Sequence, residues 1–314
     1  MLETFIKIIP LFALVALGYF CKRQAIVGVI SLKYLTRFVM YLSLPAVLLS
    51  KLATTDFATL IDIPFLSAYL LSLLCVMLIS GLVGYLLVER RANNGVMLGF
   101  GGVYGNIGFL AIPVLGASVG EWTSVPLALM LTIDLLILLP FSSFLLQISN
   151  ANNNDIDQHD SNFTPLKALK RSLLNPLIIA IIIGLILSAY SITLPTSIIG
   201  GLDLLSSAAG PCAMFIVGSA LFGRSITQNP FAAIYISTVK LAIMPFAVFL
   251  MMTLFQVNSV WVLIATLGAA MPCAAVLGVM AEEYKTLSHQ ASTAVLLTTV
   301  ISVVSLPLLI HYLH

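Results

Sequence analysis

Charged residues are scarce in this sequence. They make up 8% of its 314 residues, whereas a soluble domain carries about 25%. Hydrophobic residues account for 60% of the chain, which is more than the core of a soluble protein this long needs. Apolar runs of roughly 20 residues, the length that crosses a bilayer as a helix, recur along nearly the whole sequence. The composition predicts an all-α, polytopic membrane protein surrounded by lipid.

Catalytic, metal-binding and nucleic-acid-binding patterns are also missing. The sequence contains no HExxH, GxSxG or P-loop motif and no basic stripe interleaved with aromatic residues. Its four cysteines lack the CxxC spacing of a zinc site and do not suggest a disulfide framework; they are Cys21, Cys75, Cys212 and Cys273. We therefore expect no enzyme activity, no cofactor, no metal site and no nucleic-acid partner.

The apolar runs predict about ten spanning helices joined by short connections. A polar segment at residues 148–172 interrupts them and must lie outside the bilayer, and its basic end predicts a short interfacial helix. This segment divides the chain into a first five-helix unit at 1–147 and a second at 173–314. The expected spans lie near 4–21, 30–50, 63–88, 96–119, 123–147, 174–191, 197–222, 231–255, 259–283 and 289–312.

Lysine and arginine are distributed asymmetrically between the two sides of these spans. Most of them fall on one side, which we call the basic side. The other side carries only Lys51, while Lys7 lies in the first helix and Lys240 inside the eighth. Cationic residues collect on the cytoplasmic side of membrane proteins, so we expect both termini outside an inner or plasma membrane and the 148–172 loop in the cytoplasm. The residues on the basic side are Lys22, Arg23, Lys33, Arg37, Arg90, Arg91, Lys167, Lys170, Arg171, Arg224 and Lys285.

The two halves of the chain resemble each other at an offset of 166 residues. Five helices per half is an odd number, so the halves would enter the membrane from opposite sides, as in many secondary transporters. Chance matches among the 14 prolines are the alternative explanation. The aligned prolines are Pro10 with Pro176, Pro45 with Pro211 and Pro64 with Pro230, and after a shift of register Pro113 with Pro272 and Pro140 with Pro307.

The fourth and ninth expected spans are poorly suited to continuous helices. The fourth has six glycines between Gly99 and Gly116 as well as Asn106 and Pro113, and the ninth contains Pro272. A proline removes an amide donor and clashes with the carbonyl four residues earlier. Interrupted helices at matching positions of two repeats are a sequence indicator of a transport site, because their free amide ends suit anions. A proline kink with glycines for close packing is the alternative interpretation.

Two ionisable residues fall near the middle of their spans. Asp134 lies in the fifth span and Lys240 in the eighth. Charges at this depth are costly and are usually functional. We expect Lys240 to attract an anionic solute and the two residues to form an ion-coupling pair, while a buried salt bridge that only fixes packing is the alternative.

These features resemble the auxin efflux carrier family, in its bacterial permease form. The resemblance implies broken, crossing helices four and nine around an organic-anion site, with auxin as substrate in plants and dicarboxylates in some bacterial relatives. By this resemblance, the first crossover motif contains Gly105, Asn106 and Pro113. The second contains Pro272, followed by Cys273. Lys240 matches a lysine typical of span eight. The matching segments are Pro10 to Gly18, Leu44-Pro45-Ala46, Gly105 to Phe109 with Ile112-Pro113, Asn175-Pro176, Gly210-Pro211 with Gly218, Lys240-Leu241 with Pro245, and Ala270-Met271-Pro272.

Two functions fit this sequence. The first is a secondary transporter of a small organic anion, such as a dicarboxylate or aromatic acid, with a proton or sodium ion as the coupling partner if transport is coupled. The second is a membrane receptor or scaffold that has a transporter-like fold but moves no solute. A homodimer is one option for the assembly of either.

The charge asymmetry generates a topology prediction. A cysteine introduced at Asn153 should react only with reagents that reach the cytoplasmic face, and one at Ser191 only with reagents added outside. The measurement is labelling of single-cysteine variants by a membrane-impermeant maleimide. Swapped accessibility would reverse the orientation, and labelling of both from one side would change the number of spans.

Overall fold

A computed structural model describes residues 2–60, 62–88, 90–151, 173–223 and 230–313, and their regular structure is helical apart from one isolated bridge. The first half contains α1 (Leu2–Arg23), α2 (Val29–Phe38), η1 (Val39–Ser43), α3 (Leu44–Ala53), α4 (Phe57–Leu60), α5 (Ile63–Leu87), α6 (Ala92–Val103), η2 (Ile107–Ala111), α7 (Ile112–Ser118), η3 (Glu121–Thr123), α8 (Ser124–Ile133), η4 (Asp134–Leu138) and α9 (Leu139–Ala151). The second half contains α11 (Pro176–Ala189), α12 (Thr196–Ser207), α13 (Ala209–Leu221), α14 (Phe231–Thr238), η5 (Val239–Ile243), α15 (Met244–Leu254), α16 (Ser259–Ala269), α17 (Val276–Glu283) and α18 (Ser288–Leu313).

The prediction of an α-helical, multi-pass membrane protein is confirmed at this level. Among the described residues, six helical segments are long and apolar enough to cross a bilayer, and three shorter apolar helices accompany them. Helices occupy every range expected from the sequence, with ends that differ by at most four residues. The interfacial helix was expected at the basic end of the 148–172 segment, which lies outside the described residues. The start of this segment is described as the end of α9. The six long segments are Val29–Ala53, Ile63–Leu87, Glu121–Ser149, Thr196–Leu221, Phe231–Leu254 and Ser288–Tyr312.

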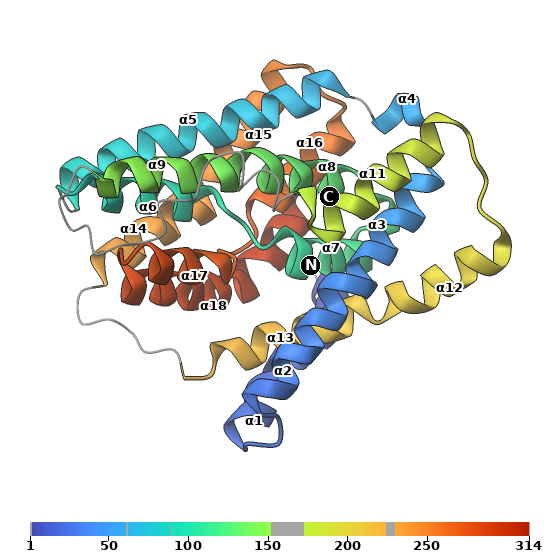
Figure 1. Cartoon of the computed structure of the whole chain (residues 1–314), viewed down its shortest axis with the longest axis horizontal. Coiled ribbons are helices and arrows are strands. Elements are labelled where there is room, and N and C mark those ends of the chain that lie inside the picture. Colours follow the sequence, from blue (N-terminus) through green and yellow to red (C-terminus); the bar gives the residue numbers. More distant parts are fainter. Residues whose placement is uncertain (1, 61, 89, 152–172, 224–229, 314) are drawn as a thin grey trace.

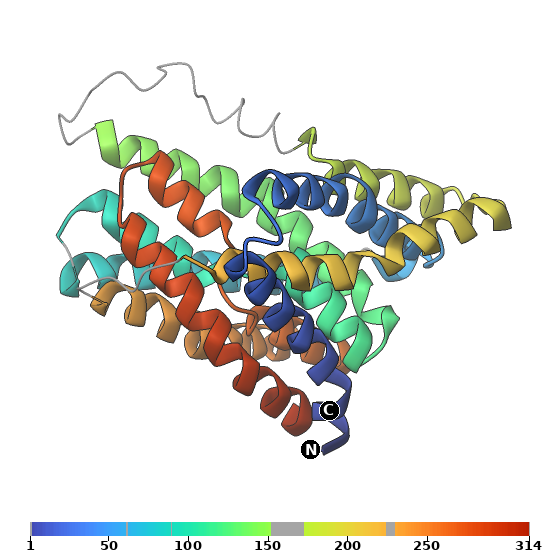
Figure 2. The same cartoon turned by 90° about the horizontal axis from the view of Figure 1, so that it is seen from below.

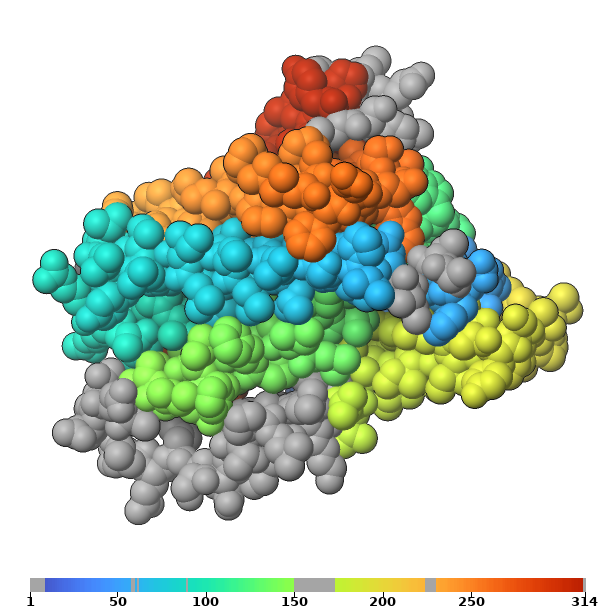
Figure 3. All heavy atoms as spheres, turned by 90° about the horizontal axis from the view of Figure 1, so that it is seen from above, coloured from blue at the N-terminus to red at the C-terminus, as the bar shows by residue number. Residues whose placement is uncertain are grey.

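Many exposed side chains on the described helices are large and apolar, as contact with lipid requires. Figure 3 shows α5 lying along one face beside α15. On this helix Leu78, Ile79 and Leu82 are each more than half exposed. Such a continuous apolar surface is unfavourable in water and matches hydrocarbon.

Four wide helical turns come directly before prolines. The π turns η1, η2, η4 and η5 precede Pro45, Pro113, Pro140 and Pro245, and in each the residue before the proline donates to the carbonyl five residues earlier. A proline would clash with the carbonyl four residues before it, and this carbonyl lies inside the widened turn in every case. The π turns therefore let these helices continue past their prolines. Such turns are frequent at functional sites.

The helices form two groups, which we call the first and second bundles. The first bundle contains α1, α2, α3, α11, α12 and α13, and the second contains α5, α6, α8, α9 and α14 to α18. Figure 1 shows the groups beside each other, with α7 at their boundary. In Figure 2, α18 of the second bundle lies beside α1 of the first. The interrupted helix α6–η2–α7 touches both bundles, which places its break at the boundary.

Glycines hold the first bundle together through close backbone contact. A Cβ atom at Gly18 of α1 would lie 2.1 Å from the carbonyl oxygen of Phe215, and one at Gly218 of α13 would lie 1.8 Å from that of Val15. The Ser219 hydroxyl donates to the Gly18 carbonyl across the same contact, at 3.0 Å. Small residues allow membrane helices to approach this closely and to gain dispersion contacts.

This contact generates a stability prediction. Gly218→Ala should force α1 and α13 apart and destabilise the protein by about 1–3 kcal/mol, the usual cost of overpacking. The measurement is thermal unfolding of the purified protein in detergent. Gly200→Ala in α12 is the matched control, because a Cβ there meets no atom within 4 Å. Equal melting temperatures for the two variants would contradict the predicted role of the glycine contact.

Candidate functional site

Two helices are interrupted near the centre of the molecule. The first break, at residues 104–106, separates α6 from η2 and α7, and the second, at 270–275, separates α16 from α17. The first break ends at Asn106, seven residues before Pro113, so the π turn rather than the break accommodates this proline. Pro272, in contrast, lies inside the second break and is buried.

The two breaks pair with each other through their backbones. The amide of Asn106 donates to the carbonyl of Pro272 at 2.9 Å, and the amide of Ala274 donates to the carbonyl of Tyr104 at 3.4 Å. These bonds flank an antiparallel bridge between Gly105 and Cys273. Gly105 and Asn106 of the fourth span therefore meet Pro272 and Cys273 of the ninth, and each break satisfies backbone groups that the other has freed. Pro113 lies in α7, outside this pairing.

Asn106 has a structural role at the start of the second half of its helix. It is half-buried and is the N-cap of η2, where its side-chain oxygen accepts from the amide of Phe109 at 3.3 Å. An N-cap asparagine satisfies one of the free amides at a helix start. Its side-chain NH₂ group remains as a donor.

Lys240 lies at the same crossing. Its side chain is 1% exposed, and Nζ donates to the carbonyl of Ala269, the last residue of α16, at 2.6 Å. A Cβ atom at Gly105 would lie 3.0 Å from this Nζ. The ammonium group therefore sits at the negative C-terminal end of a half-helix, in a space that the missing side chain of Gly105 leaves open.

Asp134 is buried nearby but does not bind Lys240 in this conformation. It is 1% exposed, and Oδ1 accepts from the hydroxyl of Tyr69 at 3.0 Å. The carboxylate lies within electrostatic reach of Lys240 and Tyr104, yet its oxygens form no ion pair within 4.0 Å among the described residues. Its Oδ2 atom is enclosed and has no hydrogen-bond partner there. The ion-coupling pair expected from the sequence stays a prediction.

Three contact residues were not anticipated from the sequence. Tyr69 binds Asp134, and Thr298 of α18 accepts from the amide of Cys273 at 3.1 Å. The thiol of Cys273 donates to the carbonyl of Gly101 at 3.4 Å. The signal available in the sequence was a polar side chain on a long apolar helix. Many such hydroxyls only bond to the carbonyls of their own helix. Sequence therefore cannot separate these from hydroxyls that bond to another segment.

Half-helix ends of both signs meet at the crossing, because α6 and α16 end there and η2 and α17 begin there. The N-terminal ends of η2 and α17 carry positive partial charge from amides without intrahelical partners. Lys240 adds a positively charged group near Gly105, where its ammonium donates to the C-terminal carbonyl of α16. Within the described ranges, no three His, Cys, Asp or Glu side chains form a group that could hold a metal ion.

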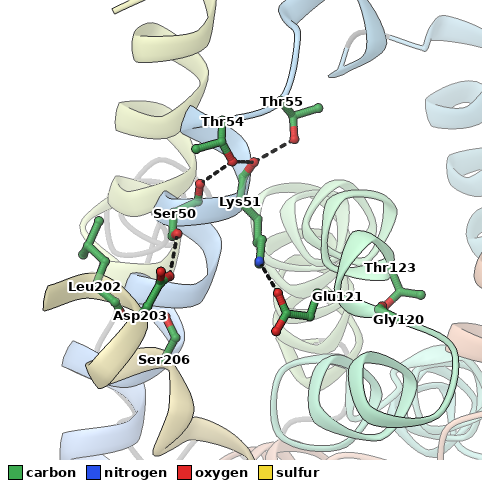
Figure 4. Close-up of polar contacts among 10 residues, drawn as sticks. All are labelled: Ser50, Lys51, Thr54, Thr55, Gly120, Glu121, Thr123, Leu202, Asp203 and Ser206. Atoms are coloured by element: carbon green, nitrogen blue, oxygen red, sulfur yellow. Dashed lines mark hydrogen bonds and ion pairs between the residues drawn. The ribbon is translucent and has the colours of Figure 1, made fainter. Parts of the chain in front are cut away.

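Far from the crossing, polar contacts at α3 join three parts of the chain (Figure 4). Lys51 forms an ion pair with Glu121 of η3, and the hydroxyl of Ser50 donates to Asp203 of α12 at 3.2 Å. Because α12 belongs to the first bundle and η3 packs against α8 of the second, the Lys51–Glu121 pair crosses the boundary and the Ser50–Asp203 contact does not.

A polar cavity of about 500 Å³ opens at a second place, where α17 and α18 meet the start of α6. Arg91, Lys285 and His289 line it together with Glu282. The cavity does not include the residues of the crossing. It lies on the side where the sequence collects basic residues.

Comparison with known proteins assigns the family. Residues 4–310 match the model of the membrane transport protein family. The chain is 25% identical over 308 residues to a protein of Rhizobium meliloti (strain 1021) named "Putative malonate transporter", which covers 98% of this chain and 95% of the relative. It is 27% identical over 307 residues to an "Uncharacterized transporter" of Methanothermobacter thermautotrophicus (strain Delta H), covering 96% of this chain and 95% of the relative. The crossing helices, the apolar bundles and this full-length match lead to one conclusion: the chain belongs to the membrane transport protein family, of the auxin efflux carrier type.

Proposed function

We propose that this protein is a secondary transporter, acting as a permease or exporter, that carries a small organic anion by alternating access at the crossing of its two interrupted helices. The observation that carries the proposal is the pairing of the two breaks beside the buried ammonium of Lys240. Irregular backbone at membrane depth is tolerated where protein or a water-filled cavity surrounds it. Half-helix amide ends and a lysine at one such place form a binding site for a carboxylate.

The architecture proposed for this function is ten spanning helices in two inverted repeats, residues 1–147 and 173–314, joined by the 148–172 loop. Equivalent contacts in the first bundle support it. At the offset of 166, Gly18 corresponds to Gly184 and Phe215 to Leu49. A Cβ at Gly18 would meet the carbonyl oxygen of Phe215, and one at Gly184 would lie 3.6 Å from that of Leu49. An inverted repeat accounts for α1 packing on α13 while α11 packs on α3.

The proposed location is the inner or plasma membrane, with both termini outside and the 148–172 loop in the cytoplasm. The basic residues of the polar cavity, Arg91 and Lys285, would then face the cytoplasm, as the positive-inside bias requires. This orientation rests on the charge distribution of the sequence.

The substrate class proposed is a dicarboxylate or aromatic acid. Malonate is the substrate named for the Rhizobium meliloti relative, and a dicarboxylate would gain from both the Lys240 charge and the helix amide ends. The alternative function is a receptor or scaffold that binds an anion at the crossing without moving it. Uptake distinguishes the two functions, because only a transporter accumulates label inside a sealed vesicle.

The deciding experiment is uptake by proteoliposomes that contain the purified full-length protein. Labelled malonate, malate, succinate and an indole carboxylate form the panel, each tested with proton, sodium and voltage gradients. Flux above that of protein-free vesicles, and competition by unlabelled anion, would support transport. No flux with any member, together with measurable binding, would favour the receptor.

Asn106 generates a prediction at the crossing. Asn106→Ala should lower transport on the order of tenfold or more, because loss of a hydrogen bond to a charged group costs about 1.5–3 kcal/mol. Asn106→Ser retains a capping oxygen but lacks the NH₂ donor, so it should remain impaired. Initial uptake rate and KM are the measurements.

The matched control for Asn106 is Asn258, which caps α16 through a bond of 2.9 Å to the amide of Val260 and lies away from the crossing. Asn258→Ala should change transport by less than about twofold, since it removes a cap only. Full activity of Asn106→Ser would assign Asn106 to capping alone and remove it from the binding site.

The Lys51–Glu121 ion pair offers a test of bundle motion. If the bundles move against each other during alternating access, breaking a contact across their boundary should change the transport rate. Lys51→Ala or Glu121→Ala should alter it up to about fivefold, matching the 0–1 kcal/mol typical of exposed ion pairs. The charge-swapped double variant should restore it. Ser50→Ala is the control inside one bundle, and an equal effect there would argue against motion at this boundary.

A further inference from the structure

The carboxylate of Asp134 is held on one side only. Tyr69 of α5 donates its hydroxyl to Oδ1 at 3.0 Å, while Oδ2 is enclosed by protein and has no partner among the described residues. Both side chains are at most 2% exposed. A buried ionised carboxylate needs several hydrogen bonds or a paired cation to offset its lost hydration. With a single neutral donor, this site is better suited to the neutral acid than to the anion.

In the part of the chain that the structure describes, the groups that face Asp134 come from several elements, and a single one of them is a cation. Tyr69 lies on α5 and Tyr104 at the end of α6. The ammonium group of Lys240 on η5 donates to the carbonyl of Ala269 and not to Asp134. Its charge therefore acts on Asp134 without a direct bond. Cys273 lies beside Lys240. The packed helix α16 has no charged residue in its sequence, and Lys51 of α3 is bound to Glu121.

We propose that Oδ2 of Asp134 is the binding site of one coupling proton, and that the protein is a proton–anion symporter. The proposal rests on the proposed transport function and names its coupling ion. A proton from water on one side of the membrane forms an O–H bond at Oδ2, which makes the carboxyl group neutral. On the other side the O–H bond breaks and the proton returns to water, which leaves the carboxylate.

The surroundings of Oδ2 suit a proton better than a metal cation. Hard cations require several oxygen ligands at once, whereas a proton needs a single lone pair. The positive charge of Lys240 lies within electrostatic reach and would oppose a second, permanently charged cation.

Lys240 supplies the link between proton and substrate. An anion bound to its ammonium would bring negative charge toward Asp134 and would neutralise the field of the lysine. Both changes favour the protonated carboxyl group. By reciprocity, protonation of Asp134 strengthens binding of the anion by the same factor. Proton and anion therefore load together and cross in the same direction.

The test uses proteoliposomes of the full-length protein with labelled malonate, or with the panel anion that shows the highest flux. External pH is held constant so that substrate ionisation does not change, internal pH is varied, and voltage is clamped with potassium and valinomycin. An inward proton gradient should raise accumulation by up to about tenfold for each pH unit if one proton accompanies each anion, because one unit corresponds to about 1.4 kcal/mol. A sodium gradient should add nothing.

Asp134→Asn should abolish the response to the proton gradient while retaining exchange of labelled for unlabelled anion. Asp203→Asn is the matched control, because Asp203 binds Ser50 far from the crossing, and it should respond like the natural protein. Tyr69→Phe removes the hydrogen bond that the Tyr69 hydroxyl donates to Oδ1 and should shift the midpoint of the pH profile, because that bond changes the balance between the charged and neutral forms of the carboxyl group.

The outcomes separate the two proposals. If flux in the natural protein does not respond to the proton gradient, or responds to a sodium gradient, the proton site is overturned and the transport function is left intact. A gradient response in Asp134→Asn equal to that of Asp203→Asn also overturns it. If Asp134→Asn loses exchange as well, Tyr69→Phe decides: an unmoved midpoint overturns the inference and a shifted one supports it. Absence of flux with every anion removes both proposals.

Discussion

Backbone hydrogen bonding at the two helix breaks is the constraint on which the rest of this structure depends. Within a bilayer an amide or carbonyl without a partner costs several kcal/mol, and each break frees such groups. The bonds from Asn106 to Pro272 and from Ala274 to Tyr104 satisfy one break with the other. The crossing is therefore stable only as a pair, which binds residues of the first half to residues far along the second.

The buried charges follow from the same geometry. Ending α16 at Ala269 leaves carbonyls that attract a cation, and Lys240 reaches one of them through the space beside Gly105. Asp134 and Lys240 both lie in π turns. These turns come directly before prolines that would otherwise disrupt the two helices. The turns that accommodate these prolines set the direction of the two ionisable side chains.

Packing in the first bundle contrasts with contact across the boundary between bundles. Gly18 and Gly218 bring α1 and α13 into backbone contact, which favours a rigid unit. Across the boundary, the Lys51–Glu121 pair is exposed on the Glu121 side, and exposed ion pairs contribute little stability. Close backbone contact inside the first bundle and an exposed ion pair at its boundary would suit the alternating access proposed above.

Sequence alone determined the helical class and the helix ranges, because apolar run length, proline position and glycine content are local properties of the chain. The meeting of the two crossover motifs was expected only from the family resemblance. Sequence alone also identified Asn106, Lys240 and Asp134, since a polar group in an apolar run is conspicuous. It did not reveal that Tyr69 binds Asp134, that Lys240 binds the carbonyl of Ala269, or that the first break precedes Pro113 by seven residues. These features were decided by the tertiary structure, because a hydrogen-bond partner and the place where a helix opens depend on which distant segment lies opposite.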